Sequence, residues 1–338
     1  MRPVSLSIGM LRALCAAARH DEMHCVDGAD AVGEMDSACA DESREILDNI
    51  CSVLSCRYGD IEGIEPIDQG LTNSSLRFEC AGESYVYRHP GVGTDEIIDR
   101  SSEAFSQSVA KRLGIDETFV YEDPQRGWKI SRFVPDCVEF DYHNRDHVER
   151  GLELARRLHE SGERSAWTFD VYAKAEEIVG MLHEESRRAF GDFDELRTCI
   201  AALYEFVCDD GVEPVLCHND FYAPNFLVGD GFMYLIDWEY SAMSDYASDL
   251  GTFICCSDYD VEQADEAIAL YFGREPSSRE RRHCFAYVAI SGYYWFVWAL
   301  YKEETGDSVG DWLGLWHRYA FEYAQRALGL YKRRRAWS

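Results

Sequence analysis

The spacing of apolar residues divides the chain into a strand-rich part followed by a helix-rich part. A helical repeat runs from Asp41 to about Gly59, and short strand-like apolar runs then replace it. Two of these runs, Leu76–Cys80 and Tyr85–Arg88, flank a short turn and predict a hairpin. The other elements expected in this part are strands at 118–121 and 129–134, and a helix that starts at 94–96 and ends before Gly114.

Beyond Pro135 the pattern becomes mainly helical. The expected helices cover 146–160, 171–190, 193–208, 261–272, 284–301 and 312–332, and a small β insert is expected at 215–217, 226–228 and 232–236. The first forty residues show no sustained period, so we expect 1–40 to be a disordered leader. The pattern therefore predicts an α+β protein, with a small lobe at 41–134 and a larger, mainly helical lobe at 135–338.

The net charge restricts the class of ligand, and the cysteine distribution indicates the compartment. The sequence has 33 Lys and Arg against 62 Asp and Glu, a formal net charge of −29, which disfavours nucleic acid and suits a cationic ligand better. Its 13 cysteines are scattered, with no CxxC pair and no zinc-type spacing. Reduced thiols in the cytoplasm fit this distribution.

One stretch, Cys284–Tyr301, is free of formal charge and long enough to raise the question of a membrane span. It contains several Tyr and Trp residues, whose polar tips are unsuited to the centre of a bilayer. We therefore expect a buried helix and no membrane insertion.

The densest group of chemically useful residues lies at Cys217–Asn225, followed by Asp237 after an apolar strand. A loop carboxylate, an amide five residues later and a second carboxylate beyond a hairpin can converge on one point. Asp220 could then accept a proton from a hydroxyl, while Asn225 and Asp237 supply hard oxygen ligands to Mg²⁺. The alternative is that Asp220 and Asn225 only bond to the loop backbone.

The segment His218-Asn219-Asp220-x4-Asn225 resembles the catalytic loop of protein-kinase-like phosphotransferases. Ile236-Asp237-Trp238-Glu239-Tyr240 resembles the metal-binding motif of the choline/ethanolamine kinase family, within the superfamily that also holds the aminoglycoside phosphotransferases. The resemblance covers roughly residues 46–332. It implies the two-lobed kinase-like fold, ATP and Mg²⁺ as cofactors, Asp220 as the catalytic residue, and Asn225 and Asp237 as metal ligands.

The small lobe carries matching features. In the resembling family, a strand Arg and a helix Glu orient the nucleotide phosphates, which assigns these roles to Arg88 and Glu103; protein kinases have Lys at the first position. Asn73 and Ser74 belong to a Gly-containing turn that could lie over phosphates, although an ordinary hairpin turn has the same composition. Ser131 and Phe133 lie in the strand that leads to the hinge, whose amides are expected to meet adenine.

The aromatic helix suggests the acceptor. Trp295 and Trp298 are three residues apart and so share a helix face, where aromatic rings can hold a quaternary ammonium; plain core packing is the alternative. The pair resembles the tryptophans of the family's choline pocket. By the same resemblance Tyr323 is expected to form a third wall, with Tyr259 and Glu239 also facing the substrate.

These observations favour an ATP- and Mg²⁺-dependent choline kinase that releases phosphocholine and ADP. Ethanolamine kinase, or an aminoglycoside or other aminoalcohol phosphotransferase, is the alternative within the same class. A catalytically inactive kinase fold that only binds ligand is the alternative outside it. We expect a cytoplasmic monomer or homodimer, with Asp249 bracing the catalytic loop and His159 packed at a helix end.

Overall fold

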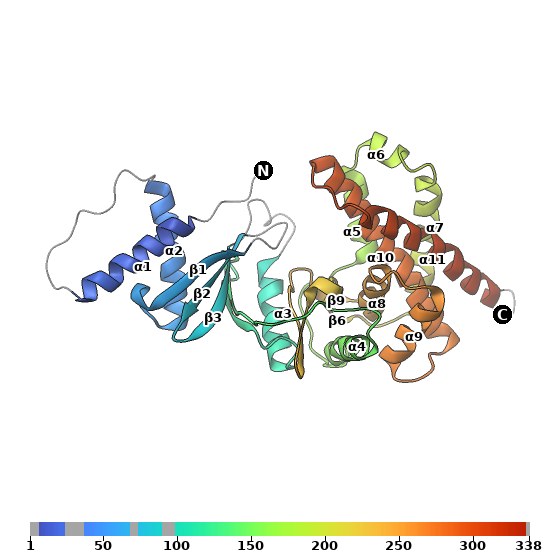
Figure 1. Cartoon of the computed structure of the whole chain (residues 1–338). Helices are drawn as coiled ribbons and strands as arrows, with labels where there is room; N and C mark the ends of the chain where they lie inside the picture. Colours follow the sequence, from blue (N-terminus) through green and yellow to red (C-terminus); the bar gives the residue numbers. More distant parts are fainter. Residues whose placement is uncertain (1–6, 24–36, 68–73, 90–98, 336–338) are drawn as a thin grey trace. The chain divides into compact units, whose positions relative to one another are not determined.

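Two groups of residues pack separately within this chain. The computed structural model describes residues 7–23, 37–67, 74–89 and 99–335 (Figure 1). The first unit comprises Met1–Lys111 and Glu117–Asp136, and the second comprises Arg112–Asp116 and Cys137–Ser338. The main division thus falls two residues beyond the boundary that we expected after residue 134.

The first unit contains an antiparallel five-stranded sheet in the order β1-β2-β3-β5-β4. Its strands are β1 Ile61–Ile67, β2 Ser74–Cys80, β3 Glu83–His89, β4 Phe119–Glu122 and β5 Lys129–Arg132. The predicted hairpin is confirmed as β2 and β3, whose turn residues Ala81 and Gly82 both have positive φ (53° and 81°). That backbone matches the twist of the flanking strands.

The helices of this unit are α1 Ile8–Met23, α2 Ser37–Leu54, the 3₁₀ turn η1 Tyr58–Asp60, and α3 Arg100–Arg112. The expectation of a disordered leader is wrong for residues 8–23, because α1 joins the core through Leu11 and Cys15. The Arg12 Nε also donates to the carbonyl of Ile64 on β1 at 2.8 Å. The apolar face of α1 is short, so its sequence pattern alone did not predict a helix. The helix gains its stability from packing against β1. Residues 1–6 and 24–36 lie outside the described residues.

The second unit is mainly helical, as predicted. Its helices are α4 Arg145–His159, α5 Val171–Met181, α6 Glu184–Arg188, α7 Phe193–Asp210, α8 Tyr246–Cys255, α9 Val261–Phe272, α10 Ser278–Thr305 and α11 Trp312–Arg335. The helix expected at 171–190 is instead broken at Leu182, where the backbone is extended. The next amide, that of His183, donates to Glu304 on α10 at 2.9 Å, so a tertiary contact accompanies the break.

Two small antiparallel sheets support the loops of this unit. They are β6 Val215–Cys217 with β9 Ala242–Ser244, and β7 Phe226–Gly229 with β8 Phe232–Leu235. A 3₁₀ turn, η3 Ala223–Asn225, leads into β7. Sequence analysis predicted β6, β7 and β8 but not β9 or α8.

Helix α10 is the central core helix of the second unit. It is long and apolar enough to cross a membrane, but 89% of its most apolar 18-residue window is buried, which confirms the expected burial. Close approach of α8 depends on Gly251, where a Cβ atom would lie 2.4 Å from the Tyr287 carbonyl oxygen. Because only glycine fits there, α8 packs closely against α10.

Candidate active site

The loop between β6 and β7 carries two of the three residues predicted to do the chemistry. The Asn225 amide nitrogen donates to the Asp220 side chain and to its backbone carbonyl, each at 2.8 Å. Both residues are buried. The Ile236 amide donates to the Asn225 carbonyl at 2.9 Å, which places Asp237 beside this loop. Asp220, Asn225 and Asp237 therefore lie together, as the sequence suggested.

The backbone of the site is held in unusual conformations. Asn219 and Asp237 both have positive φ, 64° and 66°, a region that costs non-glycine residues free energy. The Asn219 side chain offsets this cost by donating to the Tyr240 carbonyl at 3.0 Å and accepting from the Ser248 hydroxyl at 3.2 Å. The conformation of Asn219 is thus fixed by the surrounding fold.

The electrostatics of the loop are dominated by burial and by like charge. Burial, followed by the negative charge of Asp237, raises the pKa of Asp220 well above its ordinary value, against the effect of the Asn225 hydrogen bond. Burial lowers the pKa of His218, which is held in the neutral form. Its Nε2 contacts the Ile236 carbonyl at 3.0 Å, so that Nδ1 accepts from the Asp220 amide at 3.3 Å. His218 therefore shapes the loop.

Asp249 on α8 supports the same loop by accepting hydrogen bonds from its backbone amides. One of its oxygens accepts the Asn219 amide at 2.6 Å, and the other accepts the His218 amide and contacts His159 Nε2, both at 2.9 Å. Burial alone would raise the pKa of Asp249, but these hydrogen bonds and the neighbouring histidines lower it. The structure agrees with the expected bracing role.

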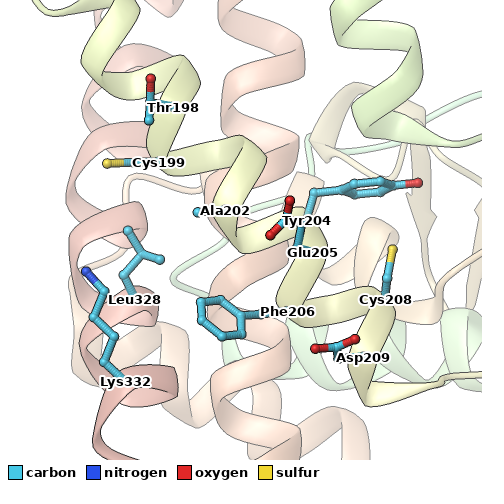
Figure 2. Close-up of a pocket in the computed structure, with 10 residues that line it drawn as sticks. All are labelled: Thr198, Cys199, Ala202, Tyr204, Glu205, Phe206, Cys208, Asp209, Leu328 and Lys332. Atoms are coloured by element: carbon cyan, nitrogen blue, oxygen red, sulfur yellow. The ribbon is translucent and has the colours of Figure 1, made fainter. Parts of the chain in front are cut away.

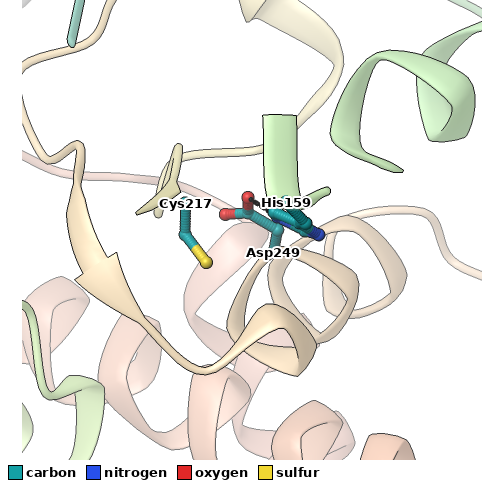
Figure 3. Close-up of side chains that lie close together, drawn as sticks. All are labelled: His159, Cys217 and Asp249. Carbon is teal, nitrogen blue, oxygen red and sulfur yellow. Dashed lines mark hydrogen bonds and ion pairs between the residues drawn. The ribbon is translucent and has the colours of Figure 1, made fainter. Parts of the chain in front are cut away.

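His159, Cys217 and Asp249 form a compact group that superficially resembles a metal site (Figure 3). Both ring nitrogens of His159 are engaged, Nδ1 with the Tyr271 hydroxyl at 2.8 Å and Nε2 with Asp249. Both Asp249 oxygens are also occupied by donors. Burial raises the pKa of Cys217 well above its ordinary value, which disfavours the thiolate that a metal requires. The group is a hydrogen-bonded brace.

Aromatic residues from α10 and α11 form a cluster next to this brace. Trp295 and Trp298 meet edge to face with ring centroids 5.6 Å apart, and Trp316 on α11 lies 5.8 Å and 6.3 Å from them. Trp295 Nε1 donates to the Thr252 hydroxyl at 3.3 Å, and Trp316 Nε1 contacts Cys256 Sγ at 3.4 Å. Asp249 lies in the first turn of α8, Thr252 lies one turn further along, and Cys256 caps the C-terminal end, so α8 connects the aromatic cluster to the loop that bears Asp220.

The aromatic cluster also reaches the acidic side of the site. The Tyr240 ring lies 6.4 Å from that of Trp295, and Tyr240 directly follows Glu239. Burial raises the pKa of Tyr240 well above its ordinary value, and the negative charges of Glu239, Asp220 and Asp237 add to this. The aromatic and carboxylate groups therefore lie within electrostatic range of one another.

Tyr323, predicted to form a third wall around the substrate, packs among aromatic residues of α10 and α11. Tyr323 packs against Phe285, with centroids 5.4 Å apart, and against Tyr319. Among the described residues no ring contact joins Tyr323 to Trp295 or Trp298, and its role toward a substrate stays a prediction. Tyr323 lies two helical turns beyond Trp316 on α11, and Trp316 holds the place by the tryptophan pair.

Tyr259, another predicted substrate residue, adjoins the catalytic loop. Its hydroxyl donates to the Tyr142 carbonyl, and the Tyr142 hydroxyl in turn accepts the Ala223 amide at 2.9 Å. Tyr319 on α11 donates to the Tyr259 carbonyl at 2.8 Å. Tyr259 thus links α11 to the turn that precedes Asn225, and its role toward a substrate stays a prediction.

In the first unit, the expected ion pair is formed and buried. Arg88 on β3 donates to Glu103 on α3 at 2.5 Å, and Glu103 is fully buried. Lys129 on β5 contacts the same Glu103 oxygen at 3.1 Å, a partner that sequence analysis missed. Burial alone would raise the pKa of Glu103, but Arg88, Lys129 and Arg100 lower it. Cross-strand pairing of Arg88 with Lys129 could have signalled this contact.

The other predicted nucleotide residues have mixed outcomes. Asn73 lies outside the described residues, and Ser74 begins β2. Ser131 pairs with Val86 inside the sheet. The Phe133 amide donates to the Ser84 carbonyl at 2.8 Å, so this particular amide is already engaged in the sheet.

A cavity of about 660 Å³ lies between α7 and α11 in the second unit (Figure 2). Figure 2 shows Cys199 and Phe206 on α7, with Leu328 and Lys332 on α11. None of the predicted site residues lines it. A second cavity of about 390 Å³ is bordered by Trp312, whose ring stacks on that of Trp316.

The donor set by Asp220 fits a magnesium ion. Because the Asn225 amide nitrogen is committed to Asp220, its oxygen is the side-chain atom left to ligate a metal. Asp237 adds a carboxylate that is only partly buried. Hard oxygen donors of this kind suit Mg²⁺, which retains several waters.

Comparison with known proteins gives consistent matches. The family model for choline/ethanolamine kinase matches residues 154–294. Protein LicA of Haemophilus influenzae is 25% identical over 253 residues, covering 72% of this chain and 74% of that protein.

Solved structures match over most of the chain. Choline kinase LicA from Streptococcus pneumoniae has a TM-score of 0.66 at 23% identity, covering 86% of this chain and 98% of that one; a second LicA structure is a complex with AMP. Spectinomycin phosphotransferase has a TM-score of 0.53 at 12% identity, covering 85% and 98%. These likenesses establish the two-lobed kinase-like fold. The family-model match over residues 154–294 and the curated relative make the chain similar to choline/ethanolamine kinases and indicate a small-molecule kinase.

Proposed function

We propose that this protein is an ATP- and Mg²⁺-dependent choline kinase that transfers the γ-phosphoryl group of ATP to the choline hydroxyl. The observation that carries the proposal is the Trp295–Trp298–Trp316 cluster, which α8 connects to the loop bearing Asp220. A quaternary ammonium cannot donate a hydrogen bond and is best held by aromatic faces. An acceptor with both a hydroxyl and such a cation matches this combination.

The Trp298 ring already accommodates a cation in this structure. The ammonium of Lys302 lies 5.5 Å from its centroid. Trp298 is also only partly buried, whereas Trp295 and Trp316 are buried. Trp298 is therefore the cluster member whose face is best suited to meet a soluble cationic ligand.

In the proposed reaction Asp220 accepts the hydroxyl proton as the oxygen attacks phosphorus. The Asn225 hydrogen bond orients the Asp220 carboxylate, and Asp249 fixes the loop that carries it. A Mg²⁺ ion held by Asn225 and Asp237 would neutralise phosphate charge and favour ionised Asp220. Most of the catalysis is then positioning and charge stabilisation by fixed groups.

Nucleotide binding is assigned to the first unit. Arg88 is permanently charged, can donate two hydrogen bonds to a phosphate, and is oriented by buried Glu103. The AMP complex of LicA supports a nucleotide as the donor substrate. Every cysteine that the structure describes is a free thiol, which suits a reaction in the cytoplasm.

Ethanolamine is the competing acceptor, because the family description includes it. A primary ammonium prefers carboxylates and carbonyls, so Glu239 would then matter more than the tryptophans. The two substrates consequently predict different responses to the same substitutions.

The test is Mg²⁺-dependent ADP release with choline, ethanolamine and spectinomycin as parallel acceptors. Asp220→Asn should lower turnover by about 10²- to 10⁴-fold while ATP binding persists. Trp298→Ala should raise the KM for choline by about 30-fold, since desolvated cation–π contacts contribute about 2 kcal/mol.

Trp312→Ala is the matched control, because Trp312 lies at the outer edge of the same cluster and is 37% exposed. It should change the KM for choline by less than about threefold. If ethanolamine is turned over and Trp298→Ala does not affect this, the assignment as a kinase stands and the proposed choline pocket is refuted. Absence of ADP release with every acceptor would contradict the proposed function.

A further inference from the structure

The first unit contains a buried group of charges that is larger than one ion pair. Lys129 Nζ and Arg88 share one oxygen of Glu103, at 3.1 Å and 2.5 Å, and Arg100 contacts the other oxygen at 3.2 Å. All four side chains are at most 11% exposed. Glu103 is therefore satisfied by three cations supplied from β3, α3 and β5.

A second carboxylate faces the same cations from β4. Glu122 is 4% exposed, and one of its oxygens lies 3.9 Å from Arg88 Nη2. Neither of its oxygens accepts a hydrogen bond from a residue that the structure describes. Burial and the adjacent Glu103 carboxylate raise the pKa of Glu122 to about 8.

The charge balance of this group depends on Glu122. With Glu122 neutral, Arg88, Arg100 and Lys129 face a single negative charge, which leaves an excess of positive charge in a buried setting. When Glu122 ionises, its carboxylate attracts Arg88 and reduces that excess. A phosphate that approached Arg88 would then compete with two carboxylates instead of one.

We propose that Lys129 and Glu122 together set the affinity of this unit for nucleotide phosphate. Lys129 neutralises Glu103 so that Arg88 can share its guanidinium with a phosphate, and ionised Glu122 withdraws Arg88 from it. Both are positioning residues that act through Arg88. This inference rests on the proposed ATP-dependent function and adds residues to which no role had been assigned.

The first test is calorimetric titration of the full chain with ATP, without acceptor, so that binding is read apart from turnover. Lys129→Met should weaken ATP binding by about tenfold, because Glu103 then depends more heavily on Arg88. Lys129→Arg should restore the affinity to within about threefold of the wild type. In kinetics the KM for ATP should rise while kcat changes less than about threefold.

The second test uses Glu122→Gln and keeps the inference falsifiable if Lys129→Met does not fold. At about pH 6.5 the variant should bind ATP as the wild type does, because Glu122 is neutral in both proteins. At about pH 9 it should bind at least threefold more tightly, since glutamine cannot acquire the charge. Thermal unfolding of each variant separates these effects from a loss of folded protein.

The outcomes are separable from those of the proposed function. Unchanged ATP affinity in folded Lys129→Met, or an affinity of Glu122→Gln that follows the wild type at high pH, would overturn the inference. Wild-type ATP binding without acceptor-dependent ADP release would contradict the proposed function alone, and the affinities of the variants would still decide this inference. A wild-type chain that binds no ATP would refute both.

Discussion

His283 provides a quantitative test of how the helices around the catalytic loop are held. Its Nδ1 contacts Asp210 on α7 at 3.2 Å, and its Nε2 contacts Asp245, the residue that caps α8, at 2.9 Å. Burial lowers the pKa of such a group, but the two carboxylates reverse this and raise it to about 9 from the ordinary value of 6.5. His283 therefore remains an imidazolium at neutral pH.

The magnitude follows from proton linkage. A shift from 6.5 to about 9, at about 1.4 kcal/mol per pH unit, corresponds to about 3 kcal/mol of stability. Because the folded pKa lies above the unfolded one, this stability is fully present below about pH 6.5 and is lost as the pH rises through about 9. Arg282, also bound to Asp210, is charged throughout this range and does not change the sign.

The measurement is urea unfolding at several pH values between about 6 and 10, for the wild type and His283→Gln. The difference in the free energy of unfolding should shrink by about 3 kcal/mol as the pH rises through that range. Tyr331→Phe is the matched control, since it removes another hydrogen bond to Asp210 from a hydroxyl whose pKa is raised far above this range. Its effect should be independent of pH below about 9, where the tyrosine hydroxyl is protonated in both the folded and the unfolded chain. A pH-independent difference for His283→Gln would refute the linkage.

Three further changes probe other contacts. Gly251→Ala should destabilise the fold by about 1–3 kcal/mol, because its Cβ would meet α10, whereas Gly180→Ala, with no atom within 4 Å, should be neutral or stabilising in chemical denaturation. Asp249→Asn should cost about 1–3 kcal/mol and lower kcat at least about tenfold, since one loop amide loses its acceptor; an unchanged kcat would contradict the bracing role. Leu11→Ala should lower the free energy of unfolding by about 2–5 kcal/mol in thermal unfolding, whereas Ala17→Ser on the exposed side of α1 should not. Equal stabilities of the two variants would exclude α1 from the core.

Features encoded over short distances along the chain were predictable from the sequence. The β2–β3 hairpin needs only two apolar runs and a turn, and Asp220 and Asn225 are five residues apart on one loop. Asp237 follows the next hairpin, so local pairing of β7 with β8 is enough to return it to that loop. Residue types at these spacings were enough to predict where the chemistry takes place.

Contacts between distant segments required the tertiary structure. Lys129 reaches Glu103 across 26 residues, and Trp316 on α11 lies beside the tryptophan pair. Helical periodicity assigns a residue to a face of α11 but does not specify which turn of α11 packs against a given residue of α10. Trp316 and Tyr323 lie about two turns apart on α11, so periodicity alone does not distinguish them. The sequence by itself therefore determined which groups are candidates for the chemistry. Packing of the helices and strands decided which partners orient them, because long-range contacts depend on the fit of whole elements and leave little trace in local sequence patterns.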